Sequence, residues 1–139
     1  MRVVLDTNVI LSAFLWQKEL KPIYLAVKAA AIIPCFNQQT WGELQRTLGY
    51  GKLKKQLAAV GLAPDDLLQL IASRSYFTIT ERGRNVIPDD PSDNDVLACA
   101  RSARALRIIS GDQHLLRLKE FYGIPILRPK DFIQQLSLG

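Results

Sequence analysis

The chain has 139 residues, of which 48% are hydrophobic and 22% charged, and its net charge is +5. That length suits one domain with one core, so we expect a single domain over residues 1–139. The composition excludes a disordered or low-complexity protein, and no apolar run is long enough to cross a membrane. The basic excess favours a polyanionic partner, because lysine and arginine gain from releasing phosphate counterions.

The two cysteines, Cys35 and Cys99, lie in apolar stretches with no second cysteine or histidine nearby in the sequence, so they form no zinc-binding pattern. Free, buried thiols in a reducing compartment are the favoured interpretation, although a disulfide between them stays open. Asp6 and Asn8 interrupt the apolar amino terminus before a signal-peptide core could form. We therefore expect a cytoplasmic protein.

The first predicted element is a buried strand over residues 2–5, followed at once by a helical pattern over residues 9–15. Asp6, Thr7 and Asn8 stand at the junction. Open α/β sheets bind ligands just past the carboxyl ends of their strands, so a carboxylate here is well placed for chemistry. Capping of the next helix by Asp6 or Thr7 explains this segment equally well.

The rest of the chain alternates between strand and helix patterns. Strands are predicted over residues 31–36, 76–80, 107–110 and 124–127, and helices over 22–30, 38–48, 53–60, 64–71, 92–105, 111–121 and 129–138. Pro34 argues that its strand lies at an edge, or that the proline lies at a strand end. The alternation predicts right-handed βαβ crossovers and a three-layer α/β/α sandwich around a parallel sheet of about five strands. Residues 81–92 are expected to form a long loop.

Further acids lie where helices and strands can bring them to Asp6. Glu43 borders the buried stripe of its predicted helix, where a carboxylate needs a metal or a cation; pairing with Arg46 is the alternative. Asp93 is on the buried side of the next predicted helix, and Asp95 is rotated away from it. First-turn acids complement a helix dipole, but the four aspartates between residues 89 and 95 exceed what a cap requires.

Asp112 follows the predicted strand over residues 107–110 and opens the next helix. It is therefore either a helix cap or a second acid at the carboxyl end of a strand, as Asp6 is.

Four segments, VVLDTNVILSAF, WGELQRTL, DPSDNDVLACA and IISGDQHLL, occur in that order, and IPILRPKDFI comes near the end. Together they resemble the PIN-domain nucleases, and in particular the VapC-related toxin components of prokaryotic toxin–antitoxin pairs. The resemblance covers essentially the whole chain. It implies a sheet with strand order 3-2-1-4-5 and a ribonuclease that depends on Mg²⁺ or Mn²⁺.

The catalytic acids and metal ligands that this resemblance implies are Asp6, Glu43, Asp93 and Asp112. Asn8 matches a polar residue after the first acid, Ser110 lies where a hydroxyl supports the site, and Asp95 is an extra candidate ligand through water. Carboxylates that converge without basic partners raise one another's pKa values, and a divalent cation removes that repulsion. Oxygen ligands select Mg²⁺ or Mn²⁺ over metals that prefer softer ligands.

The residues proposed to contact an RNA backbone are Lys52, Lys54 and Lys55, beside Tyr50, and Arg82 and Arg84 in the long loop. Trp16 and Trp41 could stack on bases, although core or dimer contacts are the commoner role of such residues. The single histidine, His114, is not needed as a base and is expected at the surface or near the rim of the site.

Two other functions fit parts of the pattern. A phosphatase of the haloacid dehalogenase type also opens with a strand ending in aspartate, but it needs a second acid where this chain has Asn8. A non-catalytic PIN-like module would bind RNA or an antitoxin without cleaving it, and the presence of all four acids argues against it. We therefore expect a metal-dependent endoribonuclease acting on RNA, with an antitoxin partner, a homodimeric assembly and no membrane association.

Overall fold

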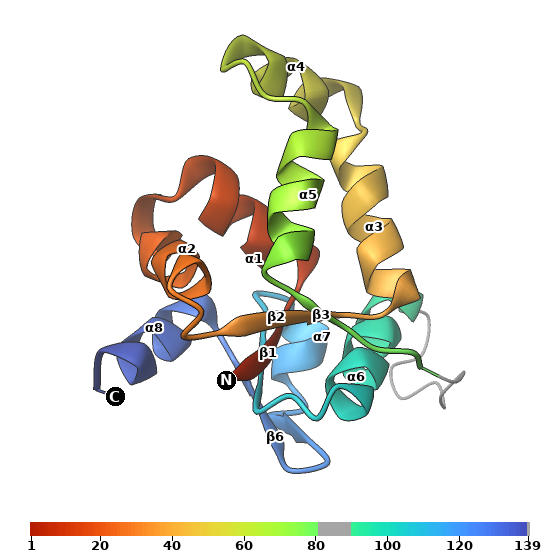
Figure 1. The fold of residues 1–139 in the computed structure, drawn as a ribbon. Helices are drawn as coiled ribbons and strands as arrows, with labels where there is room; N and C mark the ends of the chain where they lie inside the picture. The colour runs from red at the N-terminus through yellow and green to blue at the C-terminus, as the bar shows by residue number, and fades with distance from the viewer. Residues whose placement is uncertain (81–89, 139) are drawn as a thin grey trace.

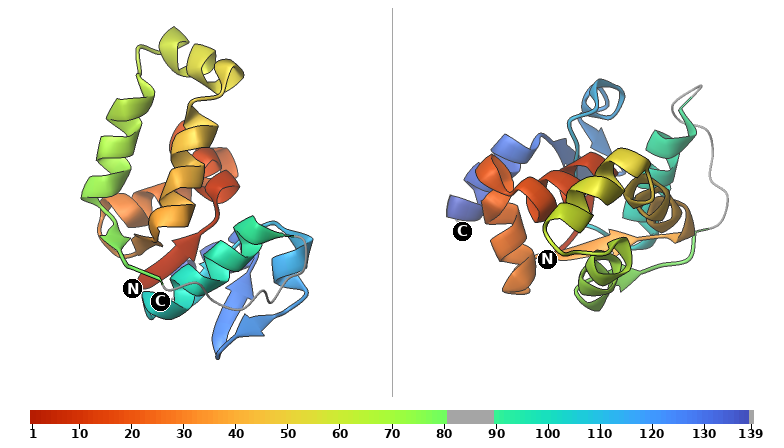
Figure 2. Two further views of the ribbon diagram at one scale, coloured as in Figure 1. Left: turned by 90° about the vertical axis from the view of Figure 1, so that its right-hand side faces the viewer. Right: turned by 90° about the horizontal axis from the view of Figure 1, so that it is seen from above.

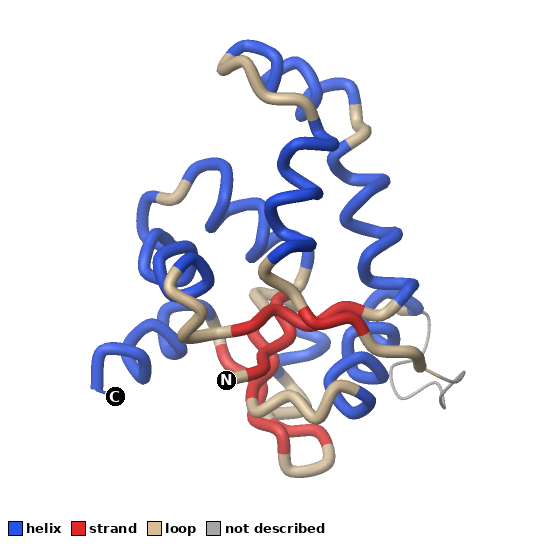
Figure 3. Tube along the Cα trace, in the orientation of Figure 1, coloured by secondary structure: helices blue, strands red, loops and turns tan. Residues whose placement is uncertain are grey.

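The computed structural model describes residues 1–80 and 90–138. Its centre is a six-stranded sheet in the order β3–β2–β1–β4–β6–β5 (Figures 1 and 3). All neighbouring strands pair in parallel except β5, which runs antiparallel to β6. The strands are β1 (Arg2–Leu5), β2 (Ile33–Phe36), β3 (Tyr76–Phe77), β4 (Arg107–Ile109), β5 (Glu120–Phe121) and β6 (Ile124–Leu127).

Helices follow most of these strands in the chain, whereas β5 and β6 form a hairpin. Most of them are α-helical, but α1 continues directly into a π-helix, η1, and a short 3₁₀ helix, η2, leads into α2. The helices are α1 (Thr7–Leu11), η1 (Ser12–Trp16), η2 (Lys18–Leu20), α2 (Lys21–Lys28), α3 (Gln38–Leu48), α4 (Gly51–Ala59), α5 (Pro64–Ser73), α6 (Pro91–Ser102), α7 (Gln113–Leu116) and α8 (Pro129–Leu138).

The side chains of β1 alternate between two hydrophobic cores, because successive residues of a strand point to opposite faces of the sheet. Val3 and Leu5 face a core built with α1, η1, α2, α3, α5 and α8. Val4 faces a second core built mainly with α6 and α7. The predicted three-layer α/β/α sandwich is therefore confirmed, and so is the order 3-2-1-4-5 when β6 is counted as the fifth strand.

Helices α3 and α5 run side by side away from the sheet, and α4 lies across their far ends (Figures 1 and 2). We call this projection the α3–α5 arm. Asn37 opens it, because its side chain accepts a hydrogen bond from the Thr40 N–H at 2.8 Å and so caps α3. Leu44 and Leu48 are fully buried along the arm, whereas Tyr50 at its end is exposed. Leu57 of α4 is also buried in the same core, so the apolar side of the arm packs along its whole length while residues such as Tyr50 face solvent.

Pro34 lies in β2, which is an interior strand. The Ile33 N–H donates to the Met1 carbonyl on the β1 side at 2.8 Å, so the nitrogen of Pro34 faces the opposite side. There, β3 pairs only with Cys35 and Phe36. The missing N–H of the proline thus falls where no strand lies alongside, which explains why an interior strand tolerates it.

Several boundaries differ from the prediction by a few residues, and two of them have a clear physical reason. The helix predicted over residues 111–121 ends at Leu116, because the chain turns through positive φ at Lys119 (62°) and then forms the β5–β6 hairpin, whose turn contains Gly123 at φ 77°. The strand predicted over residues 76–80 is assigned only at Tyr76–Phe77. Pairing with a neighbouring strand, which a single-sequence pattern does not contain, decides both outcomes.

The two cysteines provide a test of the packing. Cys35 and Cys99 are buried and free, and burial raises the pKa of Cys35 to about 11 and that of Cys99 to about 12. Since the thiolate is the reactive form, we expect neither thiol of the native protein to react with Ellman's reagent at mildly alkaline pH. Both should react once guanidinium unfolds the chain. Rapid reaction of either thiol in the native protein would contradict the packing described here.

Candidate metal centre

A pocket of about 350 Å³ opens where β1 and β4 end. Five carboxyl groups line it, and no lysine or arginine among the described residues does. We call it the acidic pocket. Its lining residues are Asp6, Thr7, Asn8, Glu43, Asp90, Ser92, Asp93, Val96, Gly111 and Asp112.

The parallel pairing of β1 with β4 brings two of these acids together. Leu5 is opposite Ile109 in the ladder, and the Asp6 N–H still donates to the Ile109 carbonyl at 3.1 Å. The next residue of β4's chain, Ser110, is completely buried. Its hydroxyl donates to Oδ2 of Asp6 and accepts a hydrogen bond from the Asp112 N–H at 3.0 Å. One serine therefore ties both strand ends together.

Three of the five acids also cap helices: Asp6 caps α1, Asp90 caps α6 and Asp112 caps α7. In each case one carboxylate oxygen accepts a hydrogen bond from a first-turn backbone N–H, at 3.0, 3.2 and 2.7 Å respectively. The cap uses one oxygen and leaves the other for different contacts. Capping, which the sequence offered as an alternative to a site role for Asp6 and Asp112, is thus present and does not exclude that role.

Asp93 has the most perturbed environment of the group. Only 6% of it is exposed, and its Oδ2 has no hydrogen-bond partner among the described residues. Burial raises the pKa of Asp93 to about 8, and the nearby carboxyl groups of Asp90 and Asp112 add to the rise. A buried carboxylate oxygen without a partner is unfavourable unless a cation or a proton satisfies it.

Two more acids complete the pocket. Burial raises the pKa of Asp6, against the hydrogen bond from Ser110, and the charge of Asp112 adds to the rise. Burial also raises the pKa of Glu43, and the charge of Asp6 adds to it. Glu43 comes from α3, so the arm contributes one wall of a pocket whose other acids follow β1 and β4 or lie at the start of α6.

A family model described as a PIN domain matches residues 2–114. The chain belongs to the PIN-domain family. It is also similar to one chain in the crystal structure of VapBC2 from Rickettsia felis bound to a DNA fragment from their promoter. The two are 12% identical with a TM-score of 0.60, over 92% of this chain and 98% of that chain, a likeness that shows a shared fold. No curated protein matches this PIN domain.

In the described part of this PIN domain, possible ligand atoms of Asp90, Asp93, Asp112 and His114 all lie within 4.8 Å of one another. Asp93 and Asp112 are among the predicted ligands, whereas Asp90 and His114 were not assigned. His114 is 56% exposed in its side chain and its Nδ1 lies 3.2 Å from Oδ2 of Asp90, at the rim where it was expected. Asp6 and Glu43 line the same pocket but lie outside this group.

Two other predicted site residues, Asn8 and Asp95, lie in different places. Asn8 lines the acidic pocket, whereas Asp95 does not. The carbonyl of Asp95 accepts a hydrogen bond from Asn37, and its carboxyl group lies near Arg46 of α3, so it faces the interface of α3 with α6.

The predicted RNA contacts lie elsewhere. Lys52, Lys54 and Lys55 are on α4, at the tip of the α3–α5 arm and outside the lining of the acidic pocket (Figure 1). Arg82 and Arg84 lie outside the described residues. Trp41 packs edge-on against the stacked rings of Phe36 and Phe77, each with a ring-centroid distance of 5.0 Å from Trp41, whereas Trp16 is 46% exposed. None of the helices in the described part of the chain is long and apolar enough to span a bilayer.

Replacing Asp93 by Asn tests the electrostatics of the pocket in chelator-treated protein. The pKa of Asp93 is higher in the folded chain, about 8, than its ordinary 3.8, so its burial lowers the stability increasingly as pH rises between those values. We expect Asp93→Asn to raise the melting temperature, more at pH 8 than at pH 5. The matched control, Asp65→Asn on the exposed start of α5, should give no gain that grows with pH. An equal gain from both variants would contradict this account.

Ser110→Ala tests the link between the strand ends. The variant removes the acceptor of the Asp112 N–H and the donor to Asp6. We expect the free energy of unfolding to fall by about 1–3 kcal/mol, the usual penalty for leaving buried polar groups unsatisfied. Urea denaturation measures it, with Ser102→Ala, at an exposed position of α6, as the matched control. Equal stability of the two variants would show that the buried hydroxyl does not hold the strand ends.

Proposed function

We propose that this PIN domain is a divalent-metal-dependent endoribonuclease. The observation that carries the proposal is the acidic pocket itself: five carboxyl groups with no lysine or arginine among the described lining residues, and a buried Oδ2 of Asp93 that accepts no hydrogen bond from them. Such a group of acids is unfavourable by itself and becomes favourable around a cation. The family match supports a nuclease.

The residues present fit a hard divalent ion. Their donor atoms are carboxylate oxygens, the ligands preferred by Mg²⁺ and Mn²⁺. The proposed ligands are Asp6, Glu43, Asp93 and Asp112, to which the geometry adds Asp90. When bound, such an ion supplies Lewis-acid activation of water and of a phosphodiester.

The chain's own groups would then position the substrate and move a proton. Ser110 fixes Oδ2 of Asp6, and α1 places Asn8 at the pocket, where its amide can donate to a phosphate oxygen. Glu43 stands on the α3 side with a raised pKa, which suits a carboxylate that accepts a proton from the attacking water. His114, held beside Asp90, would lie at the rim rather than act as the base.

We further propose that the nuclease is the toxin of a toxin–antitoxin pair and that it forms a homodimer. The fold shared with a chain of VapBC2 supports the first part. A cognate antitoxin would block the acidic pocket, so co-expression with the small protein encoded by the adjacent gene should suppress RNA cleavage. Unimpeded cleavage in the complex would favour a housekeeping role in RNA processing.

Cleavage of labelled single-stranded RNA tests the proposed activity. We expect cleavage with Mg²⁺ or Mn²⁺, none in excess chelator, and a loss of about a hundredfold or more for Asp112→Asn. The reason is that changes even to residues behind the ligands typically lose 10–100-fold. Asparagine keeps the helix cap of α7, so the loss would report on charge rather than folding. Asp131→Asn, at an exposed position of α8, is the matched control.

Two results would contradict the proposal. Cleavage that persists in excess chelator would exclude the metal-dependent mechanism. RNA binding without cleavage, in protein that calorimetry shows to bind Mn²⁺, would identify a non-catalytic PIN-like module.

A further inference from the structure

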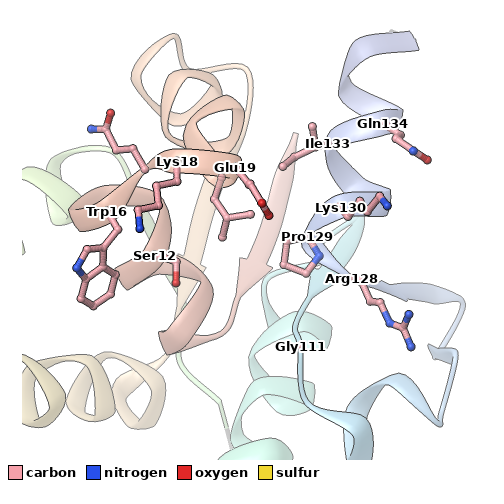
Figure 4. A pocket seen from close by; sticks show the side chains of 12 residues that line it. Ser12, Trp16, Lys18, Glu19, Gly111, Arg128, Pro129, Lys130, Ile133 and Gln134 are labelled. Carbon is pink, nitrogen blue, oxygen red and sulfur yellow. The ribbon is translucent and has the colours of Figure 1, made fainter.

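A second, larger cavity of about 960 Å³ lies between the η1–η2 segment and the beginning of α8. Figure 4 shows Trp16, Lys18 and Glu19 on one wall, with Arg128, Lys130 and Ile133 on the other. We call this cavity the Trp16 groove.

The Trp16 groove adjoins the acidic pocket. Gly111, between Ser110 and Asp112, lines both cavities. Ser12, which lines the groove, directly follows α1 and begins η1, and Thr7 at the start of α1 lines the acidic pocket. A ligand that lies across Gly111 would therefore occupy both cavities.

The charge of the groove is opposite to that of the pocket. Lys18, Arg128 and Lys130 are exposed, and none forms an ion pair within the described residues. Glu19 is the single acid of the groove among these residues. Three cations with one acid beside a pocket of five acids match a polyanion that must also reach a metal ion.

The backbone around Trp16 is unusual in two ways. Trp16 ends a π-helix, a form that is rare and concentrated at functional sites. The following Gln17 and Lys18 have positive φ values of 56° and 37°, which cost energy in residues with a Cβ. These two features turn the chain so that a half-exposed indole and the ammonium of Lys18 share one wall.

We propose that the Trp16 groove binds the single-stranded RNA segment that flanks the scissile phosphodiester, and this inference rests on the nuclease function proposed above. A base stacks on Trp16, which requires an unpaired strand, and the backbone phosphates contact Lys18, Arg128 and Lys130. The path differs from the one predicted along α4, whose lysines lie at the tip of the arm.

Binding of a short fluorescein-labelled single-stranded RNA, measured by anisotropy in chelator over a range of salt concentrations, tests the groove without cleavage. We expect Trp16→Leu to weaken binding about tenfold, equivalent to about 1.4 kcal/mol, and Trp16→Phe to restore most of it. Unlabelled RNA should quench the fluorescence of Trp16, and this quenching should vanish in Trp16→Leu, although Trp41 remains.

The cations have a separate readout. Arg128→Gln with Lys130→Gln should reduce the slope of log affinity against log salt by about 1.4, since each phosphate contact on a single strand contributes about 0.7. The matched control, Lys28→Gln with Lys119→Gln, makes the same charge change at exposed positions that line neither the groove nor the acidic pocket, and should leave this slope nearly unchanged.

The outcomes separate the two proposals. RNA binding that depends on the groove residues, in protein that does not cleave, would support the groove and contradict the nuclease. If the groove variants cleave and bind RNA normally, the inference about the groove is wrong and the nuclease proposal stands. A loss of RNA binding confined to variants of Lys52, Lys54 and Lys55 would have the same meaning. If the groove variants instead fail to bind an antitoxin protein but keep their affinity for RNA, the groove is a protein-docking surface and the inference is wrong.

Discussion

The parallel pairing of β1 with β4 is the constraint on which the site depends. Because Leu5 stands opposite Ile109, the residues that follow leave the sheet together, and the buried hydroxyl of Ser110 joins them. This is the point where the strand order reverses, since β2 lies on one side of β1 and β4 on the other. Open α/β sheets place ligands there because the loops diverge and leave room. Here that room is filled by acids.

The carboxyl groups of the acidic pocket are contacted by local hydrogen-bond donors and by one imidazole, because Nδ1 of His114 lies 3.2, 3.9 and 3.7 Å from oxygens of Asp90, Asp93 and Asp112. Asp6, Asp90 and Asp112 each accept a hydrogen bond from a backbone N–H at the start of a helix. Asp6 also accepts one from the hydroxyl of Ser110. The buried carboxylate oxygen that accepts no hydrogen bond from the described residues is Oδ2 of Asp93, the most buried of these acids. Arg46 of α3 lies near Glu43, and three more cations, Lys18, Arg128 and Lys130, line the adjoining Trp16 groove. Acidic side chains thus line one cavity and mainly basic side chains line its neighbour. This arrangement suits a nucleic-acid strand whose backbone contacts the cations while one phosphodiester lies in the acidic pocket.

Much of this could be predicted, and the failures have physical causes. Asp6 and Asp112 follow from the rule that parallel strands end together, and the burial of Asp93 follows from helical periodicity. Asp90 was missed because its side chain enters the pocket as the cap of α6, a geometry that spacing does not reveal. His114 reaches Asp90 from the first turn of α7, a contact between residues 24 apart that a sequence pattern does not reveal.

The two outermost strands, β3 and β5, are only two residues long. A long unpaired edge offers a row of N–H and C=O groups on which another chain can add as a further strand, the first step toward fibrils. Edges this short offer few such groups, even though Phe77 on β3 is 46% exposed. The short strands at both edges of the sheet therefore give a neighbouring molecule little backbone on which to add a further strand.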